Sequence, residues 1–183
     1  MNKIAEFFKK RHEGLLDAVV LVGCLLFICS YLPPKLLLLN TTPTGGDVPA
    51  HNYMVSHLKE TVARGTIISW AGGWWGGFPM FQYYFFLPYL MMALLAFFIP
   101  INIAFKIVSV VGLYAMPFAL YIGMRWMRVG RSAPAVMAAF SLPFMFVQTH
   151  TMWGVNVKST LAGMISNSVS FCLFALFSRR GLP

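Results

Sequence analysis

Charged residues are scarce in this sequence, and acidic residues are the scarcest. Only 10% of the 183 residues are charged and five are Asp or Glu, whereas 58% are hydrophobic and the mean hydropathy is +0.71. Soluble proteins average roughly 25% charged and 45–50% apolar residues. The shortage of charge therefore argues against an ordinary soluble domain and predicts an integral membrane protein.

Cysteine is also rare, and its placement argues against two kinds of site. The three cysteines lie within apolar runs, without C-x-x-C spacing or an accompanying histidine: Cys24, Cys29 and Cys172. Neither a disulfide framework nor a zinc site is predicted from this pattern. The net charge of +9 is high, but Lys and Arg cluster at the ends of apolar runs, where they can meet lipid headgroups. We therefore expect a lipid bilayer, and not a nucleic acid, as partner.

Four apolar runs have membrane-spanning character. They predict an all-α integral membrane fold with about four transmembrane helices and additional external, juxtamembrane helices. The third run is short and is interrupted by Pro143. The expected spans cover residues 15–33, 103–124, 132–149 and 161–178.

The N-terminal segment gives the first span its orientation. Residues 1–14 contain several Lys and Arg side chains, which predicts that they stay in the cytoplasm. No small-x-small cleavage site precedes Pro33, so we expect the first run to remain as an uncleaved span. Because no repeat or linker divides the chain, residues 1–183 are expected to form a single membrane domain.

A polar, glycine-rich and aromatic segment over residues 34–80 is expected to be an external loop. Within it, residues 47–65 have the pattern of an amphipathic helix, with Asp47 at a candidate N-cap and glycine at the far end. One face carries residues at spacings of three and four: His51, Val55, Leu58 and Val62. We expect this helix to lie beside the membrane.

Residues 82–99 are apolar too, but the distribution of charge argues against a further span. If this segment does not cross the bilayer, nine of the 14 basic residues lie on the cytoplasmic side, as the positive-inside rule favours. The density of aromatic residues also fits a helix within the interface. We therefore expect 82–99 to be interfacial or re-entrant, and both termini, including residues 179–183, to be cytoplasmic.

Few acidic groups are left for external acid–base chemistry. In the predicted topology only Asp47 and Glu60 are external carboxylates. His51 follows Asp47 by four residues, so the two side chains can share one helix face. Asp47 can be a simple helix N-cap and His51 an interfacial residue, or the pair can take part in proton transfer.

The same pair is too small for a metal site. Two ligands do not close a zinc site, so a divalent cation would need His57, His150 or groups from outside this chain. No metal site is predicted from the sequence alone. A divalent cation remains a possible cofactor only if the protein is an enzyme.

Two further groups of residues are candidates for substrate binding. Trp74 and Trp75 lie among glycines, where they can anchor the chain at the interface or stack on a sugar ring. Asn156 and Lys158 lie on the expected external loop before the last span, where Lys158 can meet a phosphate or simply be solvated.

The order of these motifs resembles a known group of membrane enzymes, the C-type glycosyltransferases. The similarity rests on Gly45-Gly46-Asp47 with a histidine four residues on, a helix ending at Arg64-Gly65, then Trp70, Gly77-Phe78-Pro79-Met80-Phe81, Tyr84 and Leu87-Pro88. A later loop is similar in Met152-Trp153-Gly154-Val155-Asn156 and Ser159-Thr160-Leu161-Ala162-Gly163. More narrowly, the chain resembles the bacterial and archaeal multispan proteins labelled 6-pyruvoyl-tetrahydropterin-synthase-related, over roughly Gly45 to Phe174.

This resemblance implies a prokaryotic cytoplasmic-membrane protein whose active site faces outward and takes a polyprenyl-phosphate sugar. It would make Asp47 the base that deprotonates the acceptor hydroxyl, or a metal ligand, with His51 in support. If the protein is an active transferase, Lys158 would lie near the phosphate and Trp74 and Trp75 near the sugar. Asn156 would be a further substrate-binding residue.

Two departures from the family pattern favour a different outcome. Members of the family are much longer, and Met164-Ile165 stands where we expect an acidic residue. The chain is then a fragment, part of a split gene, or a non-enzymatic descendant. The sequence thus predicts a multispan subunit derived from a C-type glycosyltransferase, non-catalytic alone and packed in a larger membrane complex through its 17 Phe and 12 Met. The alternative is an active glycosyltransferase module with Asp47 as base.

Overall fold

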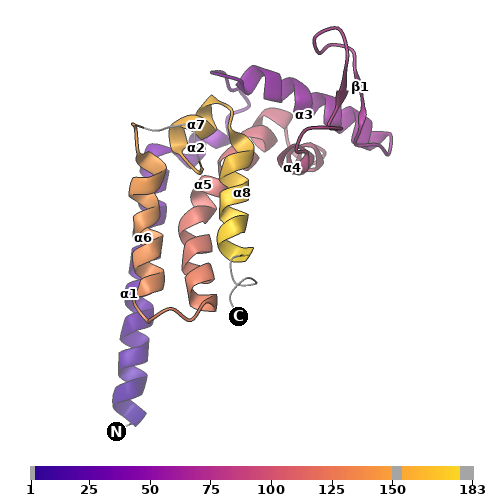
Figure 1. Cartoon of the computed structure of the whole chain (residues 1–183). Helices are drawn as coiled ribbons and strands as arrows, with labels where there is room; N and C mark the ends of the chain where they lie inside the picture. The colour runs from indigo at the N-terminus through magenta and orange to yellow at the C-terminus, as the bar shows by residue number, and fades with distance from the viewer. Residues whose placement is uncertain (1–2, 150–153, 178–183) are drawn as a thin grey trace.

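The computed structural model describes residues 3–149 and 154–177, with side chains from residue 14 onward. The expectation of a mostly helical chain is confirmed. Four helices run side by side as a bundle (Figure 1): α1 (Lys3–Tyr31), α5 (Ile101–Trp126), α6 (Ala133–Phe146) and α8 (Ile165–Phe177). Residues 150–153 and 178–183, and with them His150 and the C-terminal segment 179–183 expected to be cytoplasmic, lie outside the described residues.

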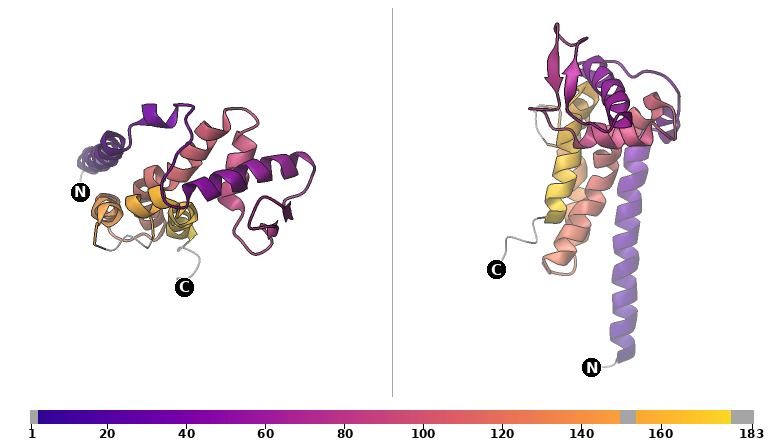
Figure 2. Two further views of the ribbon diagram at one scale, coloured as in Figure 1. Left: turned by 90° about the horizontal axis from the view of Figure 1, so that it is seen from above. Right: turned by 90° about the vertical axis from the view of Figure 1, so that its right-hand side faces the viewer.

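The remaining elements gather at one end of this bundle (Figures 1 and 2). We call it the platform end, and we call the opposite end, where residues 127–132 join α5 to α6, the loop end. The platform contains the short helices α2 (Pro34–Leu37) and α7 (Val157–Ala162), the helices α3 (Val48–Ala63) and α4 (Leu87–Leu95), and the strands β1 (Ser69–Ala71) and β2 (Phe78–Met80).

Within the described part of the chain, two helices are long and apolar enough to cross a membrane. In α1 the window Gly14–Tyr31 has a mean hydropathy of 2.2, and α5, with 26 residues, has 1.9. The apolar helices α6 and α8 have 14 and 13 residues. At 1.5 Å per residue each is about 20 Å long, against a hydrocarbon core of about 30 Å. Four spans therefore remain a prediction.

The expected span over residues 161–178 is not a continuous helix. Helix α7 ends at Ala162, and α8 begins at Ile165. Gly163 between them has a φ of +124°, a conformation that ends a helix and that favours glycine. The third expected span, 132–149, is observed as the helix Ala133–Phe146, with Pro143 inside it.

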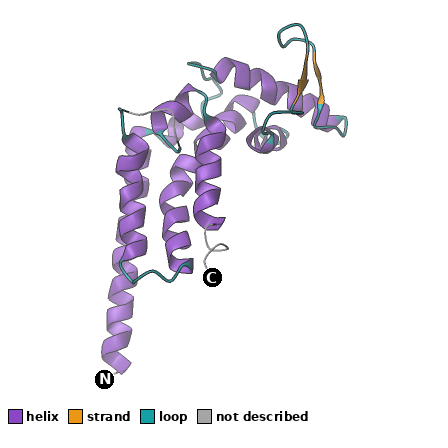
Figure 3. Ribbon diagram, viewed as in Figure 1, coloured by secondary structure: helices purple, strands orange, loops and turns teal. Residues whose placement is uncertain are grey.

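Residues 69–80 form a structure that the sequence did not predict. Strands β1 and β2 pair antiparallel, with Trp70 opposite Pro79, and make a small hairpin (Figure 3). The loop that joins the two strands projects beyond α3, away from the bundle (Figure 1). The described chain is thus not purely α-helical.

Helix α4 lies across the bundle axis, as the views in Figures 1 and 2 show. It has nine residues, so it is about 13 Å long and too short to cross a bilayer. The observed helix covers only the middle of the segment 82–99, whose interfacial or re-entrant position remains a prediction.

Helix α5 is the centre of the bundle, and glycines let it approach α8 closely. A Cβ on Gly112 would lie 2.3 Å from the backbone of Ser168, and a Cβ on Gly123 would lie 2.3 Å from the carbonyl oxygen of Ala175. Small residues allow such backbone contact between helices in membranes. The α5–α8 contact is therefore specified by residue size.

Helix α1 is attached more loosely. Only 11% of its apolar window is buried, against 50% for α5. Its polar links to the bundle include the hydroxyl of Tyr121, which donates to a carboxylate oxygen of Asp17 at 2.8 Å, and the thiol of Cys24, which donates to the carbonyl of Ala138 at 3.7 Å. Near the platform end, the ring of Phe146 packs edge-on against Phe27 and Tyr31. The exposed apolar face of α1 suits contact with lipid or with another helix.

Candidate functional site at the platform end

The loop before α3 is bonded to the end of α7. The backbone N–H of Asp47 donates to the carbonyl of Ala162 at 2.8 Å. A Cβ on Gly46 would lie 2.2 Å from that same carbonyl oxygen, so only glycine fits there. Two of the segments on which the family resemblance rests, Gly45–Asp47 and Ala162–Gly163, thus meet although more than a hundred residues separate them.

Gly163 makes a second close contact in this junction. A Cβ placed on it would lie 3.0 Å from the Cβ of Asp47 and 3.1 Å from the Nε2 of His51. Its φ of +124° is itself unfavourable for any other residue. The side chains of Asp47 and His51 therefore lie next to each other against the backbone of Gly163, as their spacing of four residues predicts.

His51 is buried and held by a second residue. Its side chain is 6% exposed, and its Nδ1 lies 2.7 Å from the hydroxyl of Tyr89. Burial raises the pKa of Tyr89, which keeps the phenol protonated. A neutral imidazole that directs its Nε2 proton to the backbone of Gly163 leaves Nδ1 to accept from Tyr89.

Opposing effects act on the pKa of His51. Burial lowers its pKa below 6.5, while the charge of Asp47 and the backbone of Gly163 raise it. Burial is the largest of these effects. The neutral form of His51 is thus favoured in the folded protein, which is the form that can accept a proton.

Asp47 itself is exposed and does not do what its position suggests. It occupies the N-cap position of α3, but its side chain makes no capping hydrogen bond, and its φ and ψ are −86° and 2°. N-cap side chains that bond the first turn usually have an extended backbone. Asp47 therefore stands at the N-cap position without the capping hydrogen bond that one of its two expected roles requires.

The two candidate residues on α7 have different surroundings. Asn156 is 1% exposed and is the N-cap of α7: its side-chain oxygen accepts from the N–H of Ser159, and its amide donates to the carbonyl of Val147. Lys158 is exposed, and its Nζ lies 3.3 Å from the amide oxygen of Gln148. Asn156 therefore organises the loop, whereas the ammonium of Lys158 reaches the surface.

The two candidate tryptophans also differ. Trp74 is partly buried and stacks on Tyr53 of α3, with ring centroids 5.8 Å apart. Trp75 is 92% exposed in the hairpin loop and has a φ of +49°, which is rare for a large residue. The hairpin thus uses one tryptophan to pack on α3 and presents the other to its surroundings.

No metal centre is found among residues 14–149 and 154–177, whose side chains the structure describes. They contain no cluster of three or more His, Cys, Asp or Glu side chains suited to an ion. His57, one of the additional ligands considered, has its Nε2 2.7 Å from the hydroxyl of Ser69 and its ring stacked on Tyr53. The structure therefore brings Asp47 and His51 together, whereas His57 contacts Ser69 and Tyr53 instead.

Sequence reasoning missed the roles of Tyr89 and Gly163. Tyr89 lies in the first turn of α4 after Pro88. Within this helix it is a tyrosine among apolar residues, and this pattern is a signal that the hydroxyl has a buried hydrogen-bond partner. Gly163 was noted only as the residue before an expected carboxylate. Comparisons with protein families, curated proteins and solved structures give no match for this chain, so they assign no family.

Proposed function

We propose that the protein is a multispan membrane subunit, derived from a C-type glycosyltransferase, that packs into a larger membrane complex and does not transfer sugar alone. The observation that carries this proposal is the set of exposed aromatic side chains between residues 69 and 86. Large apolar patches that are exposed to water mark interaction sites. These side chains are Trp70 (66% exposed), Trp75 (92%), Tyr83 (79%) and Phe85 (46%).

The position of the hairpin supports a protein partner for Trp75. If the bundle spans the membrane, the hairpin loop projects beyond α3 and away from the bundle (Figure 1). Trp and Tyr are the residues that most often contribute strongly to protein interfaces. We propose that this aromatic surface contacts the partner subunit.

Purification from native membranes in mild detergent tests the proposal. We expect a stoichiometric partner to copurify with the natural chain and to be lost with Trp75→Ala. Trp126→Ala is the matched control, because Trp126 is 46% exposed at the loop end of α5 and should retain the partner. A chain that purifies without a partner, or that keeps it in Trp75→Ala, would contradict the proposed contact.

A second candidate function is favoured by the state of Asp47. Its carboxylate is exposed and makes no capping bond, while a buried neutral histidine lies beside it. This arrangement suits a base for an acceptor hydroxyl, with a polyprenyl-phosphate sugar as donor. Under this alternative, the phosphate lies near Lys158 and the acceptor near Asp47.

An activity assay separates the two candidates. The chain in detergent or in liposomes is given a polyprenyl-phosphate sugar, and transfer is measured for the natural protein, for Asp47→Asn and for Glu60→Gln. Glu60 is an exposed carboxylate of α3 and serves as the control. Sugar transfer by the isolated chain that is abolished by Asp47→Asn but not by Glu60→Gln would establish the enzyme. For the subunit, we expect no transfer by the isolated chain. Transfer should then appear only in the complex, and it should persist there with Asp47→Asn.

The proposed orientation has its own test. Ser132 is exposed at the loop end, and in a cysteine-free background Ser132→Cys should react with a membrane-impermeant maleimide only after the cytoplasmic side is opened. Reaction from outside in intact cells would overturn the orientation with residues 125–131 in the cytoplasm.

A further inference from the structure

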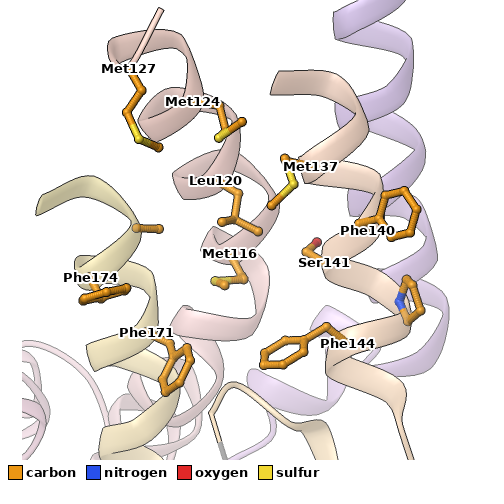
Figure 4. Close-up of a pocket in the computed structure, with 12 residues that line it drawn as sticks. Met116, Leu120, Met124, Met127, Met137, Phe140, Ser141, Phe144, Phe171 and Phe174 are labelled. Carbon is orange, nitrogen blue, oxygen red and sulfur yellow. The ribbon is translucent and has the colours of Figure 1, made fainter. Parts of the chain in front are cut away.

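An apolar groove lies between α5, α6 and α8 and was not part of the sequence predictions. Its volume is about 630 Å³, within the range of roughly 300–1,000 Å³ that is typical of ligand sites. Figure 4 shows side chains from all three helices turned towards it. Its lining includes Met116, Met124, Met137, Phe140, Phe171 and Phe174.

The groove offers an occupant almost no polar partner. Ser141 is the polar residue in its lining, and the hydroxyl of Ser141 donates to the carbonyl of Ala138 at 2.6 Å. The part of the occupant that lies here must therefore be a hydrocarbon. Methionine side chains are flexible and adapt to irregular apolar ligands.

At the loop end, a basic hollow is lined by residues that neighbour the groove lining in the chain. Met127 lines the groove, and the next residue, Arg128, lines a hollow of about 310 Å³ together with Arg125 and Arg131. Arg131 also lines a neighbouring hollow with Asp17, which lies in α1. One guanidinium group from the last turn of α5 and two from the loop that follows it suit a phosphate group.

Arg128 occupies a backbone position that normally belongs to glycine. It follows the C-cap residue of α5 and has a φ of +55°. Helices commonly end with a left-handed residue here, and glycine adopts it without the strain that a side chain introduces. The backbone conformation of the turn therefore does not favour arginine at this position. The side chain of Arg128 must account for its presence.

The shape of the groove favours a thin chain over a helix. The rings of Phe144 and Phe171 form an aromatic pair, with centroids 6.3 Å apart, that closes the groove towards the platform end. An α-helix with its side chains is about 10–12 Å wide. A flexible lining with a closed end suits a thin acyl chain better than a partner helix.

We propose that the groove and the hollow together bind one anionic phospholipid of the cytoplasmic leaflet. An acyl chain lies along the Met- and Phe-lined groove, and the phosphate group contacts Arg125, Arg128 and Arg131. The inference rests on the proposed membrane location, in which the loop end is cytoplasmic. Basic pockets between membrane helices on that side bind anionic headgroups.

Lipid binding to the full chain tests the site. The purified protein is titrated with palmitoyl-oleoyl phosphatidylglycerol or with phosphatidylcholine of the same chains, and bound lipid is counted by native mass spectrometry. We expect phosphatidylglycerol to be preferred. Arg128→Gly should reduce that preference about fivefold, the effect of one basic residue near an anionic surface.

Two measurements keep this result separate from misfolding. Arg128→Gly should unfold at the same temperature as the natural protein or a higher one in phosphatidylcholine, because glycine relieves the left-handed strain. Met137→Trp should fill the groove and weaken binding of both lipids, while a preference for phosphatidylglycerol in the residual binding persists.

Specific outcomes would overturn the lipid site. These are equal binding of the two lipids by the natural protein, an unchanged preference in Arg128→Gly, or a partner protein that occupies the groove and excludes lipid. Alkaline carbonate extraction identifies which proposal has failed. A chain that stays in the membrane but shows no preference rejects the lipid site alone, whereas a chain that is extracted rejects the membrane location and both proposals with it.

Discussion

The two ends of the bundle are built by different means. At the platform end, backbone contacts and buried hydrogen bonds fix the junction: Asp47 bonds Ala162, and Tyr89 holds His51 against Gly163. At the loop end, the groove is lined mainly by apolar Met and Phe side chains, and Met137 there is 36% exposed. The platform end depends on particular residues, while the loop end depends on their apolar character.

This difference has a physical basis. A buried polar group must keep its partner, and a glycine with both a positive φ and close neighbours has little room for a side chain, so both restrict a position to very few residues. Flexible apolar side chains around an open groove can rearrange when one of them changes. Substitutions should therefore be costly at the platform end and mild at the loop end.

The largest effect is expected from Gly163→Val. Valine meets both an unfavourable φ and a contact of about 3 Å with Asp47 and His51. Strain and overpacking of this kind cost roughly 1–3 kcal/mol each, so we expect a loss of about 3 kcal/mol or more in thermal unfolding followed by circular dichroism in detergent. Gly45→Val is the matched control, since Gly45 has a φ of +113° but open space around it. Equal losses in the two variants would show that the junction is not tightly packed.

Tyr89→Phe should have the second largest effect. It removes the hydroxyl that bonds Nδ1 of His51 and leaves a buried polar atom without its partner. Such a loss costs about 1–3 kcal/mol. Tyr83→Phe is the control, because Tyr83 is 79% exposed and should change the stability little. A Tyr89→Phe protein as stable as the natural chain would mean that water or another group serves His51 equally well.

A smaller effect should follow from pH. Because burial lowers the pKa of His51, the unfolded chain binds a proton there at a higher pH than the folded chain does. Stability should therefore decrease as the pH falls below 6.5 and stop changing once His51 is protonated in both states. In His51→Asn, which keeps an acceptor for Tyr89 and does not titrate, this part of the pH dependence should disappear. A slope that persists in the variant would assign it to other groups.

The sequence predicted the platform's main helix better than its junction. Residues 47–65 were expected to be helical and Val48–Ala63 is observed, because the proline in the first turn and Gly65 at the end act locally. Likewise, the run 103–124 lies within the helix Ile101–Trp126. A hydropathy pattern detects such elements because it depends only on neighbouring residues.

The missed features all depend on contacts between distant segments. The break at Gly163 lies inside an apolar run, and its positive φ makes sense only beside Asp47 and His51. The pairing of Trp70 with Pro79 forms a hairpin from segments with no alternating pattern. The hydrogen bond from Tyr89 to His51 joins residues 38 apart, and no local rule pairs them.

The smallest effect is expected from Met137→Leu at the loop end, and a matched substitution at the platform end makes it informative. Met137 lines the open groove, whereas Met92 of α4 is fully buried. Leucine has a similar volume but a branched and stiffer shape, so it costs little where neighbours can adjust and up to about 1.5 kcal/mol where they cannot. We expect Met137→Leu to change the free energy of unfolding by less than about 0.5 kcal/mol and Met92→Leu by about 1 kcal/mol. The groove remains apolar in Met137→Leu, so its preference for an anionic phospholipid should also persist. If Met137→Leu proves as costly as Met92→Leu, the loop end is packed as specifically as the platform end, and its groove is then a closed core instead of a site that receives a lipid chain.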